Sequence, residues 1–165
     1  MRVITVAECA SHAVVAAAIG AQSQGEQSLA ASLYPRLGED WLVIADRGFY
    51  SFAAWNAARA GGTQLLWRVK ADLTLPVVQV WADGVVHVGT DQPEDPRQCP
   101  ASGATRGPRG DDLDEQKAVL VRMVEYTVPD RVGDGTGELI TTITDASQAP
   151  ATVLAATYHD RWGAT

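Results

Sequence analysis

The stretch Trp41-Leu42-Val43-Ile44-Ala45-Asp46-Arg47-Gly48-Phe49-Tyr50 decides the fold. A short apolar run ends in a carboxylate, which is followed by an arginine, a glycine and two aromatic residues. The apolar run is too short for a membrane span and has the right length for a fully buried strand. Gly48 allows a turn, and Ser51 is expected to cap a helix over roughly 51–60.

Asp46 is therefore expected at the carboxyl end of a central strand. That end of an open α/β sheet forms the crevice that binds ligands. A structural alternative stays open, in which Asp46 only caps the loop or pairs with Arg47.

The chain around this stretch alternates strands and helices. Residues 2–8 and 13–19 predict an antiparallel hairpin, although the alanine run 16–18 also fits the start of a helix. Gly25 and Glu26 open a helix with Leu29 and Leu33 on one face, and Pro35 ends or kinks it. After the helix over 51–60, residues 64–70 form a strand, in which alternation places Arg68 and Lys70 on one face. This order predicts an α/β layered domain.

The second half of the chain is rich in strands. Residues 77–88 predict a hairpin around Ala82-Asp83-Gly84, and residues 118–128 and 138–144 predict two more strands. Residues 89–117 hold many prolines, glycines and charges, which favours a mobile loop over a metal site. Asp145 ends the last predicted strand, in a position that parallels that of Asp46 at the end of the apolar run 41–45. A final helix begins near Pro150, and Tyr158 and Arg161 are neighbours along it.

Composition leaves the class of partner open. The 165 residues are 46% hydrophobic and 20% charged, as in an ordinary globular domain. A net charge of −7 argues weakly against nucleic acid, but seven of the twenty acidic residues lie between Asp91 and Glu115. With no apolar run of membrane length, no signal peptide, and only Cys9 and Cys99 as cysteines, we expect a cytoplasmic protein without a membrane partner.

Two stretches together resemble DDE transposases of the insertion-sequence-4 type. The first is Ala45-Asp46-Arg47-Gly48-Phe49-Tyr50 with the following helix and Leu66-Trp67-Arg68-Val69-Lys70. The second is Tyr158-His159-Asp160-Arg161-Trp162, which is similar to the start of the family signature Y-x2-R-x3-E-x6-K. The resemblance covers nearly the whole chain. It implies a partial ribonuclease-H-like core, a mixed sheet with helices, interrupted by a β-rich insertion at about 77–144.

The resemblance also implies an activity. In that family three carboxylates hold two Mg²⁺ or Mn²⁺ ions, and the enzyme uses these ions to cut and join DNA. Asp46 matches the second aspartate and is expected to be catalytic and a metal ligand. Tyr158 and Arg161 match the first signature positions and imply contacts to phosphate or DNA ends, and Trp162 either stacks near a base or belongs to the core. Arg47, Arg68 and Lys70 are further expected DNA contacts.

Two of the three carboxylates have no counterpart in this sequence. The signature glutamate falls at Thr165, and the family's first aspartate belongs to a strand before the hairpin at 2–19. Glu8 is a poor substitute because it lies beside the hairpin turn, and Asp145 is just as well explained as a helix cap. We therefore expect one partial catalytic domain, truncated at both ends and inactive alone: a core over 1–76, the insertion over 77–144 and a C-terminal helix over 145–165.

Two other functions stay open at this stage. The chain could be a non-catalytic remnant that binds the DNA of transposon ends, forms a homodimer, or associates with a full-length transposase and modulates it. It could also be an unrelated α/β protein with a small-molecule crevice at Asp46, although no glycine-rich phosphate loop or Ser-His-Asp arrangement supports that alternative.

Overall fold

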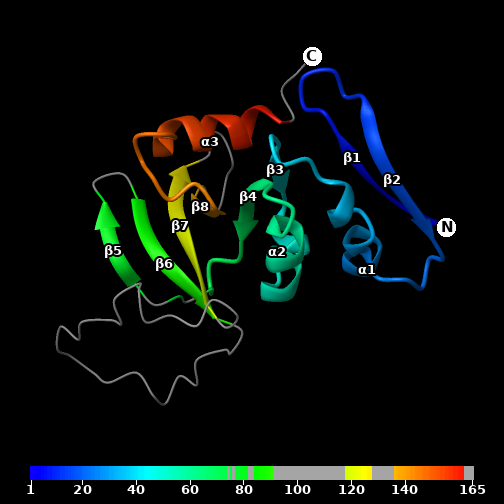
Figure 1. Cartoon of the computed structure of the whole chain (residues 1–165), viewed down its shortest axis with the longest axis horizontal. Coiled ribbons are helices and arrows are strands. Elements are labelled where there is room, and N and C mark those ends of the chain that lie inside the picture. The colour runs from blue at the N-terminus through cyan, green and yellow to red at the C-terminus, as the bar shows by residue number, and fades with distance from the viewer. Residues whose placement is uncertain (74, 76, 82–83, 91–117, 128–135, 162–165) are drawn as a thin grey trace.

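The strands form two sheets, shown in Figure 1, which is a computed structural model. It describes residues 1–165 except 74, 76, 82–83, 91–117, 128–135 and 162–165. β1 (Arg2–Ala7) and β2 (Val14–Gly20) form a two-stranded sheet. The other strands form a six-stranded sheet in the order β3-β4-β8-β7-β6-β5. Their bounds are β3 Leu42–Ala45, β4 Gln64–Val69, β5 Val77–Trp81, β6 Gly84–Thr90, β7 Ala118–Thr127 and β8 Thr136–Thr141.

Three α-helices and two short 3₁₀ helices connect and cover the strands. Their bounds are α1 Glu26–Ala31, η1 Tyr34–Arg36, η2 Arg47–Phe49, α2 Phe52–Arg59 and α3 Ala151–Asp160. α1 lies against the hairpin, where Arg2 pairs with Glu26 at 3.9 Å and donates to the Gln24 carbonyl. The predicted first helix is shorter than expected, and Leu33 is buried beyond its end.

The predicted hairpin at the start of the chain is confirmed. β1 and β2 are antiparallel with Arg2 opposite Gly20, so the alanine run 16–18 belongs to a strand and not to a helix. The hairpin predicted at 77–88 is also confirmed by the antiparallel pairing of β5 with β6.

β3, α2 and β4 form a β-α-β unit with parallel strands. The pairs run from Leu42 opposite Gln64 to Ala45 opposite Trp67. Ser51 caps α2 as predicted, because its hydroxyl accepts a hydrogen bond of 3.1 Å from the Ala54 amide. The two parallel strands therefore end at the same edge of the sheet.

The six-stranded sheet has a core on each face. Successive residues of β4 point to opposite faces, so Trp67 packs with Trp55 of α2, while Leu66 packs with Leu154 and Tyr158 of α3. The Trp55 and Trp67 rings meet edge to face with centroids 5.4 Å apart. α2 and α3 therefore cover opposite faces of one sheet.

The expectation that residues 42–45 form a central, fully buried strand was wrong. β3 is the terminal strand of its sheet, because the β1–β2 hairpin forms a separate sheet and does not pair with it. Leu42 is 36% exposed, and Val43, Ile44 and Ala45 are only partly buried.

Other predicted boundaries shift by a few residues. β6 continues to Thr90, so residues 89 and 90 belong to a strand and not to the loop, while 91–117 lie outside the described residues. The last strand begins and ends earlier than predicted, at Thr136–Thr141.

The α/β class is confirmed. A mixed sheet with helices on both faces is compatible with a partial ribonuclease-H-like core, and the β-rich segment extends this sheet because β8 pairs antiparallel with β4. None of the described helices is long and apolar enough to cross a membrane.

The outer edge of β3 generates a testable prediction. Within the described residues β3 pairs only with β4, which leaves a row of backbone N–H and C=O groups open to another chain. We expect self-association that rises with protein concentration in sedimentation velocity. Leu42→Lys should reduce it because a lysine on an edge strand opposes pairing. The matched control is Val153→Lys, which adds the same charge at a 53% exposed position on α3. A monodisperse monomer at high concentration would contradict the prediction.

Candidate functional site around Asp46

Asp46 lies immediately after β3 and opens the 3₁₀ turn η2. Its Oδ1 accepts a hydrogen bond of 2.8 Å from the Arg47 amide. Gln27 of α1 supports this turn by donating to the Gly48 carbonyl at 2.9 Å. The loop-capping alternative is therefore observed, whereas the Asp46 and Arg47 side chains form no ion pair. The Asp46 side chain is exposed, and Oδ2 makes no hydrogen bond with any described residue.

The Tyr158 hydroxyl of α3 points at the same carboxylate. It lies 3.4 Å from Asp46 Oδ1, a long hydrogen bond between residues 112 positions apart. The Tyr158 ring is 2% exposed and lies against Tyr126 of β7, with centroids 5.5 Å apart. The fold therefore brings the two sequence blocks together at one end of β3.

The electrostatic surroundings keep Tyr158 protonated. Burial raises the pKa of Tyr158 well above its usual range, the Asp46 charge adds to the rise, and Arg161 opposes it. The Arg161 guanidinium lies 3.5 Å from the centre of the Tyr158 ring in a cation–π contact, and it donates to the Tyr158 carbonyl. Tyr158 thus acts as a neutral donor with a fixed cation beside it.

A buried arginine beneath the start of α3 holds this helix in place. Arg122 of β7 is fully buried, and its Nη1 donates to the Ala149 carbonyl at 2.6 Å. Asp145 does not cap α3, whose N-cap is Pro150. It accepts hydrogen bonds of 2.8 and 2.7 Å from the Ser147 amide and hydroxyl, which lower the pKa of Asp145.

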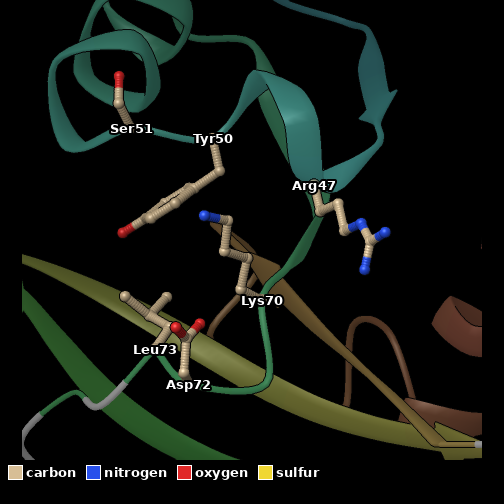
Figure 2. Close-up of a pocket in the computed structure, with 6 residues that line it drawn as sticks. All are labelled: Arg47, Tyr50, Ser51, Lys70, Asp72 and Leu73. Atoms are coloured by element: carbon tan, nitrogen blue, oxygen red, sulfur yellow. The ribbon is translucent and has the colours of Figure 1, made fainter. Parts of the chain in front are cut away.

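The basic residues lie in two places around Asp46. Arg68 of β4 contributes to the electrostatics of Tyr158 on the α3 face. Lys70 follows the last residue of β4 and lines a pocket with Arg47 and Tyr50 (Figure 2). The alternation that predicted one face for Arg68 and Lys70 applies within a strand, whereas β4 ends at Val69, and only Lys70 lines the pocket.

The remaining candidates lie elsewhere. Trp162 lies outside the described residues, and so do Thr165 and the acidic cluster at 111–115. Glu8 accepts a hydrogen bond from Ser11 within the β1–β2 connection, as expected of a turn residue. Among the described residues there is no group of three or more His, Cys, Asp or Glu side chains able to hold a metal ion.

Sequence reasoning did not single out several residues that shape this site. Tyr126 can lie flat against β8 because Gly137 is opposite it, where a Cβ would overlap the Tyr126 ring. A glycine in a strand signals such a close approach, and this signal is present in the sequence. No comparable sequence signal indicates that Tyr50, Asp72 and Leu73 line one pocket, because they come from a loop and from the residues after a strand.

The comparisons with known proteins give one relative. The chain is 25% identical over 159 residues to the transposase InsG for insertion sequence element IS4 of Escherichia coli (strain K12). The match covers 94% of this chain and 32% of the relative, so the chain spans about a third of that protein's length. No protein-family profile and no solved structure matches the chain.

The buried hydroxyl of Tyr158 leads to a prediction about alkaline stability. A folded-state pKa above the unfolded value of about 10 means that the native state keeps its proton where the unfolded state loses it. This contribution to stability is present below about pH 10 and is lost progressively as the pH rises further. We expect Tyr158→Phe to make the free energy of unfolding fall less steeply between about pH 9 and pH 11.

Urea unfolding at each pH, together with tyrosinate absorbance of the native protein, measures this effect. At neutral pH the variant should differ from the natural chain by about 1 kcal/mol or less, because the ring packing remains and the lost hydrogen bond is long. Identical pH slopes for the two proteins would contradict the assignment.

Proposed function

We propose that this chain forms part of the catalytic domain of a DDE transposase that cuts and joins DNA at the ends of an insertion sequence. One observation carries the proposal. The two sequence blocks that resemble this family meet in the fold, where the Tyr158 hydroxyl lies 3.4 Å from Asp46 Oδ1. The similarity of nearly the whole chain to a transposase supports the same conclusion.

Asp46 is the proposed metal ligand. Mg²⁺ prefers carboxylate oxygens, and Oδ2 of the exposed Asp46 has no hydrogen-bond partner among the described residues. The described residues do not fit a complete two-metal centre, because such a centre needs further carboxylates. When bound, such ions would activate the attacking oxygen and stabilise the leaving oxygen of a phosphodiester.

DNA is the proposed partner. Arg47, Arg68 and Lys70 make no side-chain ion pair with any described residue, so their charge is available for phosphates. Arg161 adds a further cation beside Tyr158. Arg47 follows Asp46, and Arg161 lies beside Tyr158, which contacts Asp46. Because the protein is acidic overall, these cations support a local DNA-binding surface and not a general affinity for DNA.

A second candidate is a non-catalytic module that binds DNA or dimerises with a full-length transposase and modulates it. The outer edge of β3, which pairs with no described strand, and the cations without an ion pair to a described residue favour this candidate. The two candidates share DNA binding and differ in metal-dependent cleavage, which separates them experimentally.

The cleavage test has a definite expected outcome. With only one proposed ligand, the isolated chain should bind Mg²⁺ weakly and should leave a labelled transposon-end duplex intact in Mg²⁺ or Mn²⁺. Asp46→Asn is the informative variant, because asparagine keeps the shape and the capping ability of aspartate while removing its charge. Cleavage by the natural chain that Asp46→Asn abolishes would show that the chain is a complete nuclease and would refute the expected inactivity.

DNA binding should depend on salt and on the named cations. Replacing Arg68, Lys70 and Arg161 together by glutamine should weaken duplex binding uniformly across sequences and reduce the slope of log K against log salt by about 3. Fluorescence anisotropy at several salt concentrations measures both quantities. Arg36→Gln is the control, since Arg36 is exposed in η1 and does not line the pocket. Equal effects per charge at Arg36 and at the named cations would argue against a defined DNA surface.

A further inference from the structure

A pocket of about 320 Å³ opens next to Arg47, the residue that follows Asp46 in the chain (Figure 2). It is lined by Arg47, Tyr50, Ser51, Lys70, Asp72 and Leu73. Tyr50 and Leu73 also pack against the core that contains Trp55 and Trp67, which places the pocket on the opposite face from Tyr158. The volume is at the lower end of the range of about 300–1,000 Å³ that small-molecule sites occupy.

The charges in this pocket favour an anion. Arg47 and Lys70 are both exposed, and neither makes a side-chain hydrogen bond or ion pair with a described residue. In Figure 2 the Lys70 ammonium extends toward Tyr50, while the Asp72 carboxylate lies beside Leu73. No ion pair joins Asp72 to Lys70, so the pocket lining carries two cations against one carboxylate. A phosphate is an anion that such cationic donors bind.

The other walls are apolar, which a site for phosphate alone does not need. The Tyr50 ring is held by Trp55, with centroids 6.4 Å apart and the rings at 63°. Burial raises the pKa of Tyr50, so its hydroxyl stays protonated and able to donate at neutral pH. Leu73 adds an aliphatic surface to the same pocket. An aromatic ring and an aliphatic side chain are the surfaces on which the base or sugar of a nucleotide packs.

We propose that this pocket binds one nucleotide unit of a DNA strand, with its phosphate on Arg47 and Lys70 and its base or sugar against Tyr50 and Leu73. Asp72, as a carboxylate in the same lining, would accept a hydrogen bond from a base amino group. The proposal rests on the proposed DNA-directed function and adds a second contact, on the sheet face opposite Tyr158 and Arg161. A strand held at both places would cross the end of β3 at Asp46.

The test uses the full chain with three probes: a deoxynucleoside monophosphate, inorganic phosphate and the corresponding deoxynucleoside. Binding is followed by NMR chemical shifts of the backbone amides. The monophosphate should bind at least about fivefold more tightly than either other probe, because it alone contacts both the cationic and the apolar side chains of the pocket. Its largest shifts should fall at residues 47–51 and 70–73.

Two variants separate the two kinds of contact. Lys70→Gln should weaken the binding of the monophosphate and the binding of inorganic phosphate alike, each by about fivefold or more. Leu73→Ala should weaken the binding of the monophosphate by about threefold or more and leave the affinity for inorganic phosphate unchanged. Arg36→Gln should change neither, and circular dichroism of each variant checks that it is folded. Equal affinity for phosphate and monophosphate, or shifts outside the pocket, would overturn the proposal.

Duplex binding distinguishes a failure of this inference from a failure of the proposed function. Leu73→Ala removes no charge, so it should leave the salt slope of duplex DNA binding unchanged. Duplex binding without monophosphate binding refutes the pocket alone. A chain that binds no DNA at any salt concentration refutes the proposed function on which the pocket's role rests.

Discussion

The parallel pairing of β3 with β4 is the constraint on which the candidate site depends. Ala45 lies opposite Trp67, so Asp46, which follows β3, lies at about the level of Arg68 in β4. A parallel pair needs a crossover, and α2 provides it on one face of the sheet. The other face is then free for α3, which carries Tyr158 and Arg161. An antiparallel connection would have placed Asp46 and Lys70 at opposite ends of the sheet.

The second constraint is the buried guanidinium of Arg122. Burying an arginine is costly unless its donors are satisfied, and here one of them binds the carbonyl just before α3. Arg122 lies on β7, within the β-rich segment, whereas Tyr158 meets Asp46 at the edge of the β3–β4 unit. The β-rich segment therefore does more than widen the sheet, because it fixes the start of the helix that completes the site. A hydrophobic residue at Arg122 would leave this carbonyl without its charged donor.

The order and type of the elements followed from local patterns, whereas tertiary placement did not. The β-rich run of residues 2–8, the Ser51 cap and the turn at Gly48 are properties of neighbouring residues, and each has its structural counterpart. The apolar content of residues 42–45 predicted a central strand, but whether a strand is central depends on which other strands pair with it. Similarly, Tyr158 was predicted only as a neighbour of Arg161 along the helix, whereas its ring is buried against Tyr126, which itself lies close to Gly137. The pocket at Lys70 was not foreseen, since its walls come from segments about twenty residues apart.

The structural and the functional interpretations of Asp46 are compatible with each other. Both contacts of its carboxylate, with the Arg47 amide and with the Tyr158 hydroxyl, fall on Oδ1. These contacts orient the side chain and leave Oδ2 without a hydrogen-bond partner among the described residues. A cation bound at Oδ2 would not need to displace the cap, and it would meet a carboxylate that is already oriented, which lowers the entropy lost on binding. The cap is therefore better understood as the device that orients the proposed ligand than as an alternative to it.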